Sequence, residues 1–104
     1  TPTELHNAVV AGADAIKIFP INKMGGASYL KALLSVFPNV ALIPTGGVKP
    51  DEITQYLKSG AMCVGLGGEL VNESLIRQGQ REKIMQLGQQ TLQQASAFSY
   101  QEVA

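Results

Sequence analysis

Residues 11–20 read Ala-Gly-Ala-Asp-Ala-Ile-Lys-Ile-Phe-Pro, and residues 59–64 read Ser-Gly-Ala-Met-Cys-Val. In each stretch a glycine ends a helix-like segment and a short apolar run follows it. Gly12 and Gly60 are 48 positions apart, and a further apolar run at 40–43 lies between them. One helix–strand unit therefore recurs about every 24 residues, and strands that alternate with helices predict parallel βα units.

Four segments have the end signals or the apolar spacing of helices. Thr1, Pro2 and Glu4 are typical of a capping box at the start of the first helix, which we expect to end at Gly12. A stripe at i, i+3, i+4 and i+7 predicts a second, half-buried helix, and it consists of Leu30, Leu33, Leu34 and Phe37. The other two helices are expected over residues 50–60 and 80–97.

The expected fold class is α/β, of the parallel (βα)8 TIM-barrel type. A complete barrel typically has ~250 residues, so this chain of 104 residues corresponds to about the last three strands and four helices. We assign residues 1–98 to this half-barrel and residues 99–104 to a frayed tail. Three parallel strands cannot close, and their inner face would be exposed. The other half then lies on sequence outside these 104 residues or on another chain, and a small open α/β sandwich is the structural alternative.

Composition and charge narrow the class of protein. Apolar residues make up 45% of the chain, charged residues 15%, and eight Lys/Arg balance eight Asp/Glu, so the formal net charge is zero. This excludes a disordered charged tail and argues against nucleic acid as a partner, because no basic stripe exists. No apolar run has the ~18 residues of a membrane span. With one cysteine, and with Thr1 rather than a signal peptide at the start, we expect a soluble cytoplasmic protein without a metal site.

Lys17 stands in the middle of an apolar strand run, between Ile16 and Ile18. Because side chains alternate along a strand, the isoleucines share one face and Lys17 lies on the other with Phe19. If the isoleucines face the helices, Lys17 points into the barrel, where burial lowers the pKa of its ammonium group. A neutral lysine amine is a nucleophile that forms Schiff bases with ketones. The structural alternative is an edge-strand lysine whose head group reaches solvent.

Two Gly-Gly pairs, Gly46-Gly47 and Gly67-Gly68, each follow a predicted strand and precede helical sequence. Glycine lets a backbone approach a ligand closely with its N–H groups. In TIM barrels a phosphate often binds in the loops after the seventh and eighth strands, near a short extra helix. Residues 68–72 are the candidate for that helix, and the three strands would then be the sixth to the eighth. The alternative is that these glycines serve only as turn residues.

Other candidates lie beside these motifs. The Thr45 hydroxyl stands at a strand end, where it could meet a ligand or cap a helix. Phe19 and Pro20 could form the wall of a small substrate pocket, and Phe19 fits a core position equally well. Cys63 lies in an apolar run and is expected to be a small buried residue.

Several of these motifs together resemble the KDPG/KHG aldolases, the 2-keto-3-deoxy-6-phosphogluconate and 4-hydroxy-2-oxoglutarate aldolases. The resemblance covers about residues 1–95, in order and with matching spacings. Its most specific parts are the Lys-x-Phe-Pro motif at 17–20 and the Pro-Thr-Gly-Gly motif at 44–47. Further matches are Thr-Pro-Thr-Glu at 1–4, Gly-Gly at 25–26, Phe-Pro-Asn-Val at 37–40 and Val-Gly-Leu-Gly at 64–67.

The resemblance implies a class I aldolase on a (βα)8 barrel, a lyase that acts without a metal or cofactor and is usually a homotrimer. It would cleave a small 2-keto acid to pyruvate and an aldehyde, glyceraldehyde 3-phosphate or glyoxylate, as in the Entner–Doudoroff pathway. By this resemblance Lys17 is the Schiff-base lysine, Phe19 and Pro20 flank the pyruvate end, and Thr45 lines the pocket. The phosphate-binding residues would be Gly46, Gly47, Gly67 and Gly68.

The chain also departs from the family pattern. Gly68 stands where members often have a serine, and Asn22 stands where many have a glutamate. The family's general acid/base glutamate, its carboxylate-binding arginine and a threonine belong to earlier strands, which this chain does not contain. A second hypothesis is therefore a truncated half-barrel that binds phosphate or assembles with a partner without turnover. A third is another phosphate-binding barrel enzyme in which Lys17 is structural.

Overall fold

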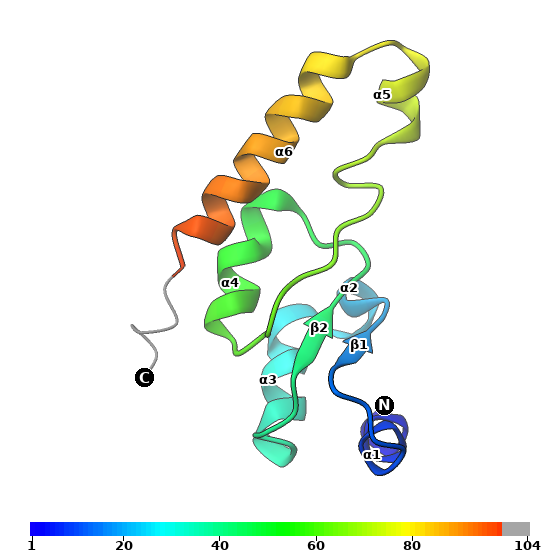
Figure 1. Ribbon diagram of the computed structural model, residues 1–104, viewed down its shortest axis with the longest axis vertical. Helices are drawn as coiled ribbons and strands as arrows, with labels where there is room; N and C mark the ends of the chain where they lie inside the picture. Colours follow the sequence, from blue (N-terminus) through cyan, green and yellow to red (C-terminus); the bar gives the residue numbers. More distant parts are fainter. Residues whose placement is uncertain (99–104) are drawn as a thin grey trace.

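The computed structural model describes residues 1–98. Helices and strands alternate along most of the chain, and the later part is helical (Figure 1). In order, the elements are α1 (Pro2–Val10), β1 (Ile16–Ile18), α2 (Ile21–Met24), α3 (Gly26–Val36), β2 (Leu42–Pro44), the 3-10 turn η1 (Pro50–Glu52), α4 (Ile53–Lys58), α5 (Glu73–Arg77) and α6 (Arg81–Ser96). The four helices expected from the sequence all form, and α2 and α5 are additional short ones.

The helix ends follow from local chemistry. At the start of α1 the Glu4 N–H donates to Thr1 Oγ1 at 3.3 Å, which completes the expected capping box. After α1 the chain turns at Gly12, whose φ of +88° lies in the left-handed region that favours glycine. In α3 the expected apolar stripe is present, with Leu30 and Leu33 buried.

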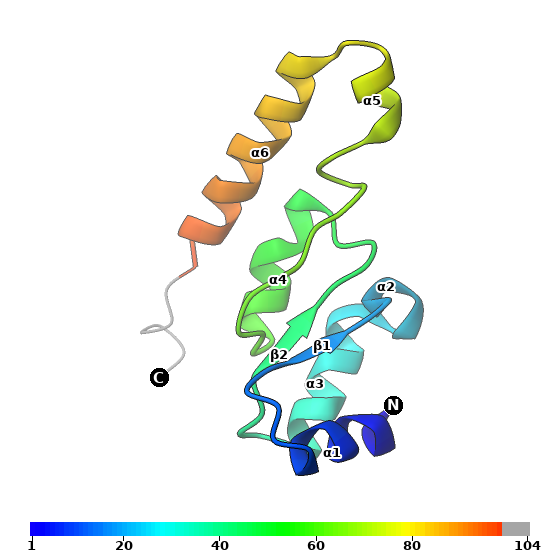
Figure 2. The same cartoon turned by 45° about the vertical axis from the view of Figure 1, so that its right-hand side comes forward.

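The two strands form a parallel ladder, β1 beside β2, in which Lys17 is paired with Ile43. The ladder begins where the Ile16 N–H donates to the Ala41 carbonyl oxygen at 2.8 Å. Figure 2 shows the two strands side by side, with α3 on one side of them. This parallel pairing confirms the expected βα connection between the two strands.

The prediction of a third regular strand over residues 61–64 was wrong. The Met62 N–H donates to the Leu42 carbonyl oxygen and the Gly65 N–H to that of Pro44, each at 2.9 Å. Between these bonds the segment advances three residues while β2 advances two. This extra residue breaks the period-2 pattern of a ladder, so the described structure has two strands and one isolated parallel bridge, Thr45 to Gly65.

The core lies between one face of the β1–β2 ladder and the helices packed on it. Ile16 and Ile18 are each 9% exposed, and Leu42 is fully buried. They pack with residues from α1, α2, α3, α4 and the segment after α4. The buried members include Leu5, Ile21, Leu30, Leu33, Ile53, Tyr56, Leu57 and Ala61. Burial, with a smaller effect from the negative charge of Glu52, raises the pKa of the Tyr56 hydroxyl.

The last two helices form an extension from this core (Figure 1). The short helix expected at 68–72 does not form, because residues 68–70 form a turn. The short helix α5 begins after Asn72, whose side chain accepts a hydrogen bond from the Leu75 N–H at 3.1 Å. The Thr54 hydroxyl holds α6 to α4 by donating to the Gln94 carbonyl oxygen at 3.0 Å. Along α6, Ile84, Leu87 and Thr91 are half-buried, as is Phe98 just after the helix, whereas Ala95 is exposed.

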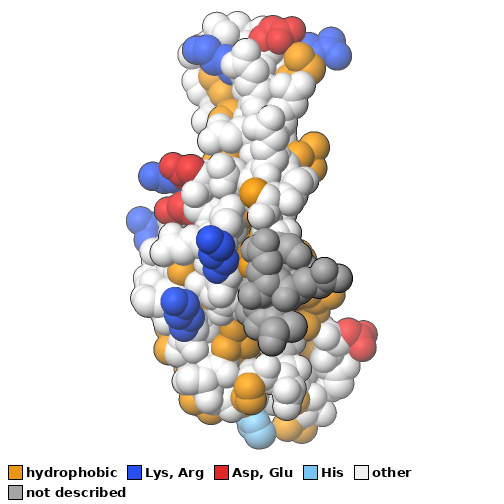
Figure 3. Space-filling view, turned by 90° about the vertical axis from the view of Figure 1, so that its left-hand side faces the viewer, with side chains coloured by type: hydrophobic (Ala, Val, Ile, Leu, Met, Phe, Trp, Pro, Cys, Tyr) orange, Lys and Arg blue, Asp and Glu red, His pale blue; other side chains and the backbone are white. Residues whose placement is uncertain are grey.

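On the face drawn in Figure 3, charged side chains of both signs are dispersed among hydrophobic ones. This distribution agrees with the balanced charge of the sequence. Within residues 1–98, no helix combines the length and apolarity needed to cross a membrane. The expected frayed tail, 99–104, lies outside the described residues.

Replacing Leu42 by alanine should lower the free energy of unfolding by ~2–5 kcal/mol, because the change leaves a cavity where the ladder meets the helices. Leu92→Ala is the matched control, since Leu92 is 69% exposed on α6. Urea denaturation of both variants measures the effect. Equal losses of stability would contradict this placement of the core.

Candidate functional site

A cavity of about 420 Å³ opens where the carboxyl ends of β1 and β2 meet the segment after the isolated bridge. Most of its lining consists of residues that the sequence singles out, although Pro20 is not among them. The lining residues are Lys17, Phe19, Thr45, Gly46, Gly47, Leu66, Gly67, Gly68 and Glu69. The fold thus brings residues from three chain segments to one site, at the strand ends where barrel enzymes bind their substrates.

Lys17 lies on the expected side of β1 but not in the expected environment. Its neighbours Ile16 and Ile18 face the core, so strand alternation turns Lys17 toward the opposite face. The expectation of a buried Lys17 was wrong for this chain: the side chain is exposed, because no element within residues 1–98 covers that face. Its Nζ atom lies 5.5 Å from the centroid of the Phe19 ring, within the range of a cation–π contact.

Phe19 and Pro20 continue the chain from β1 to α2. Phe19 is 65% exposed, so it is not a core residue, and it forms one side of the cavity. Pro20 is half-buried, follows a cis peptide bond, and lies outside the cavity lining. Pro20 instead packs against the turn at Gly46-Gly47, the first glycine turn, since a Cβ atom at Gly46 would lie 2.9 Å from the Cα atom of Pro20.

The first glycine turn has no room for side chains. Gly46 and Gly47 have φ values of +95° and +71°, which glycine adopts at little cost. A Cβ atom at Gly46 would lie 2.8 Å from Cδ2 of Phe19, and one at Gly47 would collide with the Asn22 side chain. Among residues 1–98, no acceptor takes a hydrogen bond from the Gly47 N–H.

The second glycine turn, Gly67-Gly68, has free space around its Cα atoms. Neither Gly67 nor Gly68 has positive φ, and a Cβ atom on either would meet nothing within 4 Å. Their N–H groups donate to no other group in the described part of the chain. Backbone donors of this kind can bind an anion, although the carboxylate of the adjacent Glu69 would oppose one. Leu66 and Glu69 also line the cavity but were not among the predicted site residues. The available signal was that Leu66 belongs to the Val-Gly-Leu-Gly motif at 64–67 and that Glu69 follows Gly68 directly.

Thr45 faces the cavity and does not cap a helix. Its hydroxyl donates to the carbonyl oxygen of Ile43, in the strand β2 that ends just before it, at 3.3 Å. Gly65, its partner in the bridge, is required to be small, because a Cβ atom there would lie 2.5 Å from Thr45 Oγ1.

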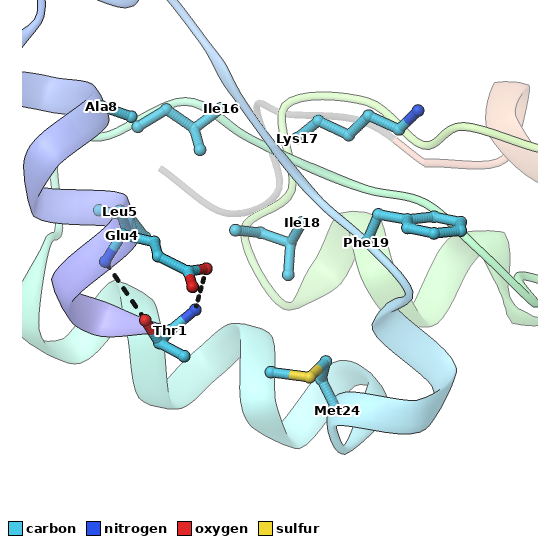
Figure 4. Close-up of a pocket in the computed structure, with 9 residues that line it drawn as sticks. All are labelled: Thr1, Glu4, Leu5, Ala8, Ile16, Lys17, Ile18, Phe19 and Met24. Atoms are coloured by element: carbon cyan, nitrogen blue, oxygen red, sulfur yellow. Dashed lines mark hydrogen bonds and ion pairs between the residues drawn. The ribbon is translucent and has the colours of Figure 1, made fainter.

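A second hollow, of about 450 Å³, lies between α1 and β1 (Figure 4). Lys17 and Phe19 border both hollows, while Leu5, Ile18 and Met24 line this one. In the close-up Lys17 extends away from the Thr1–Glu4 capping pair. The amine therefore points away from the start of α1.

Cys63 is exposed, which corrects the expectation that it is buried. It stands between the two bonds that join its segment to β2, where the extra residue interrupts strand alternation. An apolar hollow of about 330 Å³ between α4 and α6 includes it.

An α/β protein with a lysine and two glycine turns at the ends of parallel strands has the arrangement typical of a TIM-barrel enzyme site. The chain belongs to the KDPG and KHG aldolase family, whose family model matches residues 1–87. It is 39% identical over 99 residues to the 2-dehydro-3-deoxy-6-phosphogalactonate aldolase of Escherichia coli K12, covering 94% of this chain and 42% of that protein.

Solved structures are also similar to this chain. The structure described as native KDPGal has a TM-score of 0.64 and 34% sequence identity, covering 89% of this chain and 47% of that one. A designed cube-shaped protein cage, made by fusing symmetric oligomeric domains, has a TM-score of 0.65 and 33% identity, covering 93% and 40%. The chain spans less than half the length of the relatives it matches, and its short parallel ladder with helices is consistent with part of their barrel.

Gly46→Ala should lower the free energy of unfolding by about 1–3 kcal/mol, because it forces alanine into positive φ and against Phe19 and Pro20. Gly67→Ala is the matched control and should change stability by less than ~0.5 kcal/mol, since its Cβ atom meets open space. Denaturant unfolding compares the two variants. A Gly67→Ala loss as large as that of Gly46→Ala would refute the difference between the two turns.

Proposed function

We propose that the protein to which this chain belongs is a class I aldolase that cleaves a 2-keto-3-deoxy-6-phospho sugar acid, or 4-hydroxy-2-oxoglutarate, through a Schiff base on Lys17. One observation carries the proposal. Lys17 and both glycine turns line a single cavity at the carboxyl ends of parallel strands. Family membership supports aldol chemistry in general, and the position of Lys17 in that cavity selects it as the nucleophile.

The reaction uses the amine as follows. The neutral Lys17 amine attacks the C2 ketone to form a carbinolamine, which takes up a proton from solvent and loses water to give a protonated imine. A base from outside these 104 residues removes the proton of the C4 hydroxyl. The C3–C4 bond then breaks, its electron pair moves into the imine to form an enamine, and the aldehyde departs. Protonation of the enamine at C3 and hydrolysis by water release pyruvate and regenerate the amine.

The glycine turns would bind the far end of the substrate. The N–H groups of Gly47, Gly67 and Gly68 donate to no partner within residues 1–98, so they are available to phosphate oxygens. Binding energy from this remote group orients the reacting carbons over Lys17. Thr45 and Phe19, which border the cavity between the lysine and the turns, would contact the keto-acid part.

The exposed lysine face indicates what the rest of the protein supplies. Within the described residues nothing covers Lys17, which is exposed, or Phe19, which is 65% exposed. Covering this face by the remaining strands of a barrel would desolvate the Lys17 amine, which is one of the ways in which a lysine nucleophile is activated. Assembly of subunits is part of the same proposal, because the designed cage that this chain resembles is made from symmetric oligomeric domains.

Borohydride reduction in the presence of pyruvate should trap pyruvate covalently on Lys17 in the natural protein, and peptide mass mapping locates the adduct. Lys17→Met should abolish trapping and lower kcat by roughly 10³-fold or more, as expected when a covalent nucleophile is removed. Lys31→Met, at an exposed position of α3, is the matched control and should retain activity. An active Lys17→Met protein, or an adduct at another lysine, would overturn the assignment.

The same exposure favours a second candidate for the isolated 104-residue chain, a half-barrel that assembles or binds phosphate without turnover. We expect the purified chain to form larger assemblies in sedimentation experiments, because its lysine-bearing face is uncovered. It should show no aldolase activity, since the family's acid/base glutamate is expected on earlier strands that the chain does not contain. Measurable turnover by the monomeric chain would rule out this candidate.

A further inference from the structure

The first turn of α2 is bonded to the glycine turn that follows β2. The Ile21 N–H donates to the Thr45 carbonyl oxygen at 2.8 Å, and the Asn22 N–H donates to that of Gly46 at 3.2 Å. The two hydrogen bonds extend the β1–β2 pairing beyond the strand ends. The segment after Lys17 and the turn at Gly46-Gly47 are thus joined through their backbones.

The Asn22 side chain adds a contact that the backbone does not supply. A Cβ atom at Gly47 would collide with the Asn22 carboxamide, and it would lie 2.8 Å from the Asn22 Cβ atom. The side chain of Asn22 therefore occupies the space beside the Gly47 Cα atom. Asn22 is exposed and is not part of the cavity lining, so it contacts the turn from outside the site.

We propose that Asn22 is a positioning residue for the binding of the substrate's terminal phosphate. This inference rests on the proposed function, in which the Gly46-Gly47 turn binds that phosphate. The carboxamide supports the turn on its outer side and keeps the Gly47 N–H, which has no acceptor among residues 1–98, directed at the ligand. Asn22 acts through Gly47 and does not touch the reacting carbons.

This role predicts an effect confined to the phosphate end of the substrate. Without the carboxamide, the turn has room to move outward, and its N–H groups lose their fixed distance from the phosphate oxygens. Binding of a phosphorylated substrate should weaken, whereas a substrate without phosphate loses nothing. The chemical step at Lys17 should keep its rate, because the β1–β2 register that places the lysine is unchanged.

The test compares Asn22→Gly with the unaltered natural protein on 2-keto-3-deoxy-6-phosphogluconate and on its dephosphorylated form. We expect KM for the phosphorylated substrate to rise about tenfold, the usual result of losing one hydrogen bond to a charged group. We expect kcat to change by less than ~2-fold and KM for the dephosphorylated form to stay constant. Asn39→Gly, the same change at an exposed turn position, is the matched control and should leave both KM values unaltered.

A double variant tests the contact between the Asn22 side chain and Gly47. In the natural background, Gly47→Ala should raise KM for the phosphorylated substrate strongly, because its Cβ atom collides with Asn22. In the Asn22→Gly background the same change should raise KM less, since the colliding side chain is gone and only the positive φ of residue 47 remains unfavourable. Fully additive effects would show that the two residues act independently and would overturn the proposal.

Borohydride trapping separates this proposal from the proposed function. If pyruvate is trapped on Lys17 but Asn22→Gly leaves KM for the phosphorylated substrate unchanged, the positioning role is wrong and the aldolase assignment stands. If Asn22→Gly raises KM equally for the phosphorylated and the dephosphorylated substrate, the residue is merely structural and the proposal also fails. Should Asn22→Gly not fold, Asn22→Ser keeps a Cβ atom in the helix and removes the carboxamide, with the same expected rise in KM. Failure to trap pyruvate on Lys17 overturns the proposed function and with it this inference.

Discussion

The continuous backbone pairing between β1 and β2 is the constraint on which the site depends. It starts at the bond from Ile16 to Ala41, and at its far end Thr45 donates to Ile18 at 2.9 Å. Ile21 and Asn22 extend it past the end of the strands. A shift of one residue along this ladder would turn Lys17 toward the core and Ile16 toward the cavity. The position of the amine relative to the glycine turn is therefore a consequence of hydrogen-bond register.

The two faces of the ladder differ in what covers them, and this difference carries the functional argument. One face is closed by helices over Ile16, Ile18 and Leu42. The other bears Lys17, which is exposed within the described residues. An enzyme that uses a lysine as nucleophile gains from desolvating it, and the chain spans less than half the length of its relatives. The described part supplies the position of the amine, and we propose that the rest of the protein supplies its low-dielectric surroundings.

Local sequence signals predicted the elements well where their causes are local. The capping box at Thr1 and the apolar stripe of α3 depend on residues within a few positions of one another, and both are confirmed. The alternation of residues around Lys17 correctly predicted the face of β1 on which it lies. Whether Lys17 is exposed depends on which distant elements cover that face. The strand expected at 61–64 was wrong because its pairing with β2 includes an extra residue, which composition does not reveal. For the same reason Cys63 is exposed rather than buried.

The sequence by itself determined the four main helices and the two paired strands, the side of β1 on which Lys17 stands, and the motifs that place the chain in its aldolase family. These depend on periodicity and on residue types such as glycine, whose backbone freedom is intrinsic. Only the tertiary structure decided that Lys17, Thr45 and the two glycine turns line one cavity, and that Asn22 occupies the space beside Gly47. Those contacts join segments separated by twenty positions or more, and they depend on strand register and on close packing, which no local pattern encodes.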